Sequence, residues 1–155
     1  MTIHRQTIST DPKAVGTRKE AALRSPRIAA FDAAEFDELS EMIGQIGAVE
    51  MIGIFESETR LRLRRLAAGT QDSATLVREM HTLKGAAGTV GAPRLTALGR
   101  TFEHAAQKGI SPAPRDLAAI EDALEAFLRE ARARSQSRAA TACVRDYIRE
   151  ATAPA

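Results

Sequence analysis

Apolar residues recur every three or four positions between about residues 32 and 134, the spacing typical of amphipathic α-helices. Five segments share this pattern, and capping or helix-breaking residues separate them. They cover approximately residues 32–46, 48–68, 73–90, 93–108 and 115–134. No stretch alternates apolar and polar residues over a useful length, as a half-buried strand would. The pattern therefore predicts an all-α protein, an antiparallel four-helix bundle with an additional short N-terminal helix.

The first of these segments has an apolar face that we expect to point into the core. Asp32 is expected to cap its start, and Gly47 to end it, because glycine is common just past the last turn of a helix. The apolar face comprises Phe36, Leu39, Met42, Ile43 and Ile46. Asp72 or Ser73 is expected to start the helix that reaches residue 90.

The two ends of the chain lack the strong pattern of the middle. Residues 135–138 are polar, and Val144, Tyr147 and Ile148 mark a possible C-terminal helix around residues 139–150. We therefore divide the chain into a flexible basic leader, a four-helix-bundle domain and a polar linker with a weak C-terminal helix or tail. These parts span residues 1–31, 32–134 and 135–155.

Charge and cysteine content narrow the possible functions. The sequence pI is about 9.0, but the first 31 residues hold six basic and two acidic residues, and the remainder holds 16 basic and 18 acidic ones. The bundle domain is therefore mildly acidic, which argues against nucleic-acid binding. Cys143 is the single cysteine, which fits a reducing compartment, and no apolar run is long enough to span a membrane. We expect a cytoplasmic protein without a membrane segment.

The residues with the clearest chemical meaning lie on the helix of residues 73–90. His81, Lys84, Gly85 and Gly88 share one face, because residues three, four and seven positions apart align on a helix. Each glycine costs about 1 kcal/mol relative to alanine in a helix interior. Bare backbone beside a histidine suits the close approach of a partner protein or a phosphoryl group. The alternative is tight packing of a neighbouring helix.

An imidazole at the edge of a bundle suits a phosphoryl carrier. Its neutral form is a nucleophile at physiological pH, and Lys84 can offset charge on the transferred oxygens. If the next helix forms a hairpin turning near Ala92, residue numbers summing to about 184 lie at one height. His81 then lies level with Glu103, whose carboxylate could accept a hydrogen bond from the ring and fix its tautomer. Glu103 could instead be an ordinary solvated residue.

The run His81-Thr82-Leu83-Lys84-Gly85, followed by Gly91 and by Leu95, Leu98 and Phe102-Glu103, resembles the signature of histidine phosphotransfer (HPt) domains. The resemblance covers about residues 32–134, and part of it is similar to the phosphotransfer domain of chemotaxis-type kinases. It implies that His81 is phosphorylated, that Lys84 supports the phosphoryl group and that Glu103 matches a carboxylate that contacts the histidine. We expect Gly85, Gly88 and Val77 to contact the partner.

The resemblance also implies a role in a two-component phosphorelay. The chain would carry phosphate between the receiver domain of a hybrid histidine kinase and that of a response regulator, and those receivers would supply the aspartate and the Mg²⁺. We expect a monomeric phosphoryl carrier that binds no cofactor or metal and has no ATP-dependent kinase activity of its own. The alternative is a helical bundle that binds a receiver or kinase domain as a regulator without carrying phosphate.

Two further patterns leave alternatives open. His81, Glu103 and His104 could gather around a metal ion, although no HxxxH or ExxH pair supports such a site. A dense basic run late in the second long helix is either a solvated face or a surface that steers an acidic receiver. This run consists of Arg60, Arg62, Arg64 and Arg65.

Overall fold

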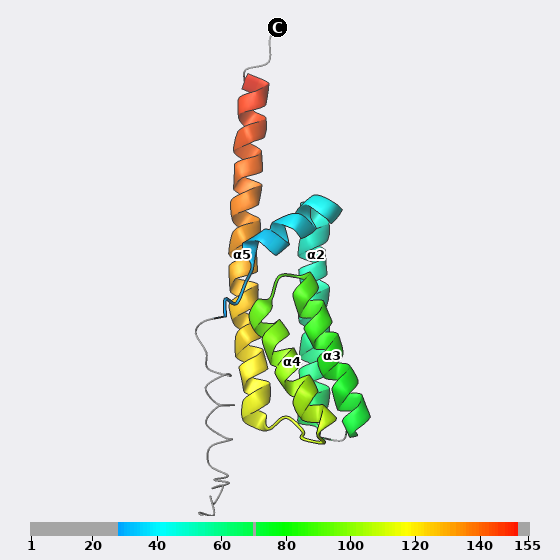
Figure 1. Ribbon diagram of the computed structural model, residues 1–155. Helices are drawn as coiled ribbons and strands as arrows, with labels where there is room; N and C mark the ends of the chain where they lie inside the picture. Colours follow the sequence, from blue (N-terminus) through cyan, green and yellow to red (C-terminus); the bar gives the residue numbers. More distant parts are fainter. Residues whose placement is uncertain (1–27, 70, 152–155) are drawn as a thin grey trace, which may run out of the picture.

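A computed structural model describes residues 28–69 and 71–151, which form four α-helices (Figure 1). The helices are α2 (Ala33–Ala67), α3 (Ser73–Thr89), α4 (Pro93–Gln107) and α5 (Pro114–Ala151). α3 and α4 form a closely packed hairpin, with α2 and α5 beside it. These two stretches of chain contain no strand. The predicted all-α helical bundle is confirmed.

The helix starts follow from local capping chemistry. The Asp32 carboxylate accepts hydrogen bonds from the backbone N–H groups of Ala34 and Glu35, at 3.0 and 3.4 Å. Asp72 accepts one from Thr75 N–H at 2.7 Å. Each bond satisfies an N–H that has no partner within the helix. Asp32 therefore acts as the predicted N-cap, and of the two predicted candidates for the start of α3, Asp72 and Ser73, the cap is Asp72.

α2 contains a sharp bend that makes the additional N-terminal helix. Gly44 has φ +83° and ψ 158°, a conformation open to glycine but not to ordinary L-residues. The short segment before it runs from α5 across to the long part of α2 (Figure 1). The prediction placed the end of this helix at Gly47, but the break lies at Gly44. Met42 and Ile46, on either side of this bend, are 79% and 77% exposed. The prediction that these two, with Ile43, face the core was wrong.

α5 is helical without interruption, including the polar residues 135–138 where a break was predicted. Arg134 and Arg138 bind the carboxylate of Asp37 at the start of α2, and Arg138 Nε also donates to Gln45 at 3.0 Å. Ion pairs thus continue the packing of α5 after its apolar stripe ends. The last part of α5 rises beyond the other helices (Figure 1). No helix among the described residues combines the length and apolarity that crossing a membrane requires.

The core lies where all four helices meet, and it holds the α3–α4 hairpin in place. Phe127 of α5 is fully buried, with its ring centroid 6.0 Å from that of Phe31 and 5.7 Å from that of Phe55. Such pairs add to the stability that burial gives. Each helix supplies an aliphatic or aromatic stripe. The largest fully buried residues besides Phe127 include Phe36, Met80, Leu83, Leu95, Phe102, Ile120, Leu124 and Leu128.

Candidate functional site

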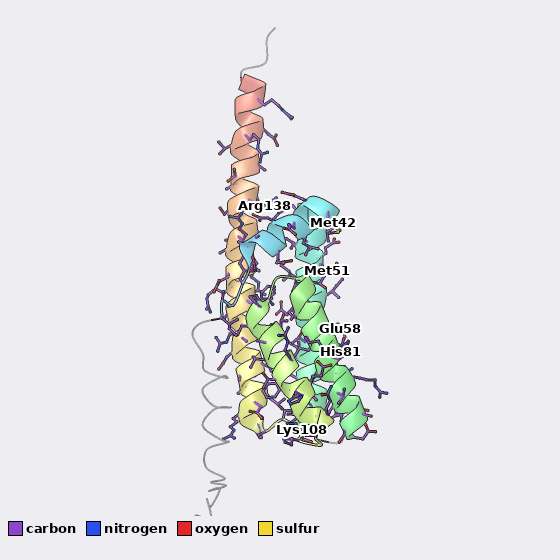
Figure 2. All side chains as sticks on the ribbon, viewed as in Figure 1. Met42, Met51, Glu58, His81, Lys108 and Arg138 are labelled. Carbon is purple, nitrogen blue, oxygen red and sulfur yellow. The ribbon has the colours of Figure 1, made fainter. Side chains whose placement is uncertain are left out.

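His81 lies on α3 at the edge of the bundle (Figure 2). Its neighbours Met80 and Leu83 are buried in the core, and they fix the rotation of α3 about its axis. The His81 side chain is 67% exposed. The imidazole is therefore open to a second protein, although the helix that carries it is held firmly.

Glu103 of α4 joins His81 and Lys84 of α3 in one polar cluster. Its Oε1 lies 2.7 Å from His81 Nδ1, and its Oε2 accepts a hydrogen bond from Lys84 Nζ at 2.6 Å. Lys84 Nζ is also 3.3 Å from His81 Nδ1. The structure thus brings together all three residues that the sequence singled out, and it shows Lys84 bound to Glu103 beside the ring.

The charge on Glu103 sets the direction of its hydrogen bond with the histidine. The hydrogen bond from Lys84, and then that from His81, hold the pKa of the Glu103 carboxyl below its usual value of 4.5. The carboxylate is therefore ionised at neutral pH and can only accept. His81 Nδ1 must donate, which leaves the proton-free lone pair of the neutral ring on Nε2. None of the described residues makes a hydrogen bond to Nε2.

The glycines of the hairpin have different surroundings. A methyl group added at Gly85 would meet nothing within 4 Å, whereas one at Gly88 would lie 3.9 Å from Thr96 Oγ1 of α4. Gly85 therefore leaves open space beside His81, and Gly88 lies at the α3–α4 contact. Val77, on the same side of α3, is half-buried and packs against the core.

Gly99 of α4 was not singled out from the sequence, yet it lies directly against the backbone of α3. A methyl group there would lie 2.9 Å from Lys84 N and 3.0 Å from Lys84 Cα. A signal did exist, because Gly99 is a glycine in a helix interior and lies level with Gly85 by the same hairpin rule.

A shallow apolar groove of about 320 Å³ runs between α2 and α3, on the side of His81 away from α4. Met51 and Ile54 line it from α2, and Thr82, Ala86 and Thr89 line it from α3. Ile54 is exposed. Figure 2 labels Met51 and Glu58, which mark the α2 side of the groove. Because Thr82 follows His81 directly, a protein that covers the imidazole would also reach this groove.

Most arginines of the basic run of α2 form ion pairs with carboxylates of the same chain. Arg62 and Arg65 both bind Glu79 of α3, while Arg60 binds Glu56 and Glu125. Arg64 is exposed. Three of the four arginines therefore form ion pairs within the chain, so most of the positive charge of this run is explained without a partner protein.

The metal hypothesis gains no geometric support. Within residues 28–69 and 71–151, no group of three or more His, Cys, Asp or Glu side chains is placed to hold a metal ion. His104 is exposed on α4, and the contacts of the Glu103 carboxylate are with His81 and Lys84.

Comparison with known proteins decides the family. A family model described as the Hpt domain matches residues 50–133, more than half of the chain and all of the polar cluster. The chain belongs to the Hpt domain family. No curated protein and no solved structure matched in the same comparisons. Hpt domains carry out histidine phosphotransfer in two-component phosphorelays and interact with receiver domains, and the helical bundle described above fits this family.

Proposed function

We propose that this chain accepts a phosphoryl group on Nε2 of His81 from the aspartyl phosphate of a receiver domain, and passes it to the aspartate of a second receiver. The observation that carries the proposal is the exposed imidazole whose Nδ1 lies 2.7 Å from the Glu103 carboxylate. One ring nitrogen is fixed as a donor, and the other is left as a nucleophile facing the surface.

The transfer needs few groups from this chain. The Nε2 lone pair attacks phosphorus, the bond between phosphorus and the aspartate oxygen breaks, and the aspartate leaves as a carboxylate. The ring becomes positively charged, and Glu103 stabilises that charge while it holds the Nδ1 proton. Lys84 has three donors, so its ammonium can turn toward a phosphoryl oxygen while it still contacts Glu103. The receiver would supply Mg²⁺, which would neutralise charge on the phosphoryl oxygens.

The proposed docking surface surrounds His81 on two sides. Gly85 offers open backbone, and Gly88 and Val77 extend the same side of α3 toward α4. The groove at Ile54 offers apolar area on the α2 side. A receiver that buries this surface would bring its aspartyl phosphate to Nε2 and exclude water from the reaction.

We further propose a bundle domain of residues 32–134 between a basic leader and a C-terminal extension. The carrier would act as a monomer, in the cytoplasm with its receiver partners, between a hybrid histidine kinase and a response regulator. It would have no ATP-dependent kinase activity of its own.

The direct test follows labelled phosphate from a phosphorylated receiver to the purified chain. Acid-labile, base-stable label should appear on the native chain and on His104→Gln, and it should be absent from His81→Gln. His104 is a matched control, since it is an exposed histidine on the adjacent helix. Label that persists in His81→Gln would refute the assignment. A chain that binds several receivers but takes no label from any of them would support the non-catalytic regulator instead.

A second test addresses docking. Gly85→Ala should raise the stability of α3 by about 1 kcal/mol, because its methyl group meets nothing in the free chain. The same methyl group should slow transfer from the receiver. If the transfer rate of Gly85→Ala is unchanged, Gly85 is not part of the docking surface.

A further inference from the structure

Gly99, one helical turn before Glu103, lies directly against the α3 backbone at Lys84. A methyl group on Gly99 would lie 2.9 Å from Lys84 N and 3.0 Å from both Lys84 Cα and Lys84 Cβ. A contact of 2.9 Å is shorter than real Cβ atoms make, and the atoms it would meet are backbone and Cβ atoms that cannot turn away, so alanine at this position requires α4 to move away from α3. Gly99 is buried, and glycine is otherwise disfavoured in a helix interior.

This contact point lies level with the polar cluster. Lys84, which Gly99 touches, is one turn after His81, and Glu103 is one turn after Gly99. The distance between the helices here sets how far the Glu103 carboxylate must reach. At present it reaches Lys84 Nζ at 2.6 Å and His81 Nδ1 at 2.7 Å. Hydrogen bonds from nitrogen to oxygen in proteins usually measure about 2.7–3.2 Å, so a separation of the helices by more than about 0.6 Å would take both contacts out of this range.

We propose that Gly99 is a positioning residue for phosphotransfer. It holds α4 close enough to α3 for Glu103 to fix the His81 tautomer that leaves Nε2 free. This role rests on the proposed function, because the tautomer matters only if Nε2 carries the phosphoryl group. In metal sites, loss of the carboxylate that orients a histidine costs about 10- to 100-fold in affinity or activity. We expect a loss of the same order when the helices separate.

The test uses the full chain, a phosphorylated receiver and four variants. Gly99→Ala should slow transfer by about 10- to 100-fold, and ¹⁵N NMR of the His81 ring should show a smaller fraction of the Nδ1–H tautomer. Gly53→Ala is the control, because Gly53 also lies in a helix interior and its methyl group would meet nothing within 4 Å. It should keep both the rate and the tautomer.

A double-mutant cycle separates positioning from general damage. Glu103→Gln alone should slow transfer, and Gly99→Ala combined with Glu103→Gln should be no slower than Glu103→Gln alone. Losses that multiply in the double variant would overturn the proposal, as would a native tautomer in Gly99→Ala.

The proposal can be overturned even if Gly99→Ala is unstable or no label is transferred. An unstable variant is measured in trimethylamine oxide, which favours the folded state. If native His81 is mainly the Nε2–H tautomer at neutral pH, the positioning role is wrong. If the tautomer behaves as expected but no receiver transfers label, the proposed function fails and the positioning of the ring by Gly99 stands.

Discussion

Glu79 of α3 binds two arginines of α2 whose exposure differs greatly. The Arg62 side chain is 7% exposed, with its Nε 2.6 Å from Glu79 Oε2, and Arg65 is 44% exposed, with its Nη2 3.2 Å from Oε1. Glu79→Gln removes the negative charge and leaves the Arg62 guanidinium buried without a counter-charge. Such a loss costs about 3–5 kcal/mol in a buried pair. Because Glu79 is partly exposed, we expect about 3 kcal/mol here.

The two arginine variants should differ in proportion to burial. Arg65→Met should cost less than about 1 kcal/mol, as is usual for an exposed ion pair. Arg62→Met should cost about 1–2 kcal/mol, because Met keeps most of the apolar contact and Glu79 still has Arg65 and water. The free energy of unfolding is measured by urea titration with circular dichroism at neutral pH. High salt should reduce the contribution of Arg65 more than that of Arg62.

The double variant Arg62→Met with Glu79→Gln gives the sharpest check of this reasoning. It removes both buried charges, so it should be more stable than Glu79→Gln alone. If the double variant is less stable than either single variant, desolvation of Arg62 is not the cause. If Arg65→Met destabilises as much as Glu79→Gln, burial does not set the energy of this network.

Three further predictions concern stability, and each can be checked by the same titration. Gly109→Ala should cost about 1 kcal/mol because its φ is +73°, whereas Gly91→Ala, at the same φ, should cost about 2–3 kcal/mol because its methyl group would also lie 2.9 Å from Asp32 O. Phe127→Ala should cost about 3–5 kcal/mol, since the ring is fully buried. The hydrogen bond from Arg134 lowers the pKa of Asp37 below its usual 3.8. The ionised carboxylate therefore stabilises the fold fully above about pH 4, and this stabilisation is lost as pH falls through the folded-state pKa. Asp37→Asn should remove this part of the pH dependence of the free energy of unfolding.

Features set by local chemistry could be predicted from the sequence. The aspartate caps, the glycine-proline turn before α4 and the apolar stripes gave the helices of the bundle. The turn also predicted that Glu103 lies level with His81, because an antiparallel hairpin fixes heights once its turning point is known. Whether the carboxylate faces the ring depends on helix rotation and spacing, which residue numbers do not contain.

Features set by tertiary contacts could not be predicted in this way. Gly44 and Gly47 are equally able to end a helix, and the choice of Gly44 goes with the ion pairs between Asp37 and the arginines of α5. The same ion pairs keep α5 helical through residues 135–138, where no apolar stripe marks the buried side. Periodicity detects a helix face through apolar residues, so a face held by arginine and aspartate escapes it.

The polar cluster shows why a local motif is only half of this site. The spacing of His81, Lys84 and Gly85 follows from one helix, so it can be recognised in the sequence. In the proposed transfer, the ring is a directed nucleophile only when a carboxylate from a second helix holds Nδ1. That carboxylate can reach Nδ1 because Gly99 lets α4 lie against the backbone of Lys84. In these proposals, Gly85 beside the histidine leaves room for a receiver, and Gly99 behind Lys84 lets the carboxylate come close, so glycine opens space on one helix and allows close packing on the other.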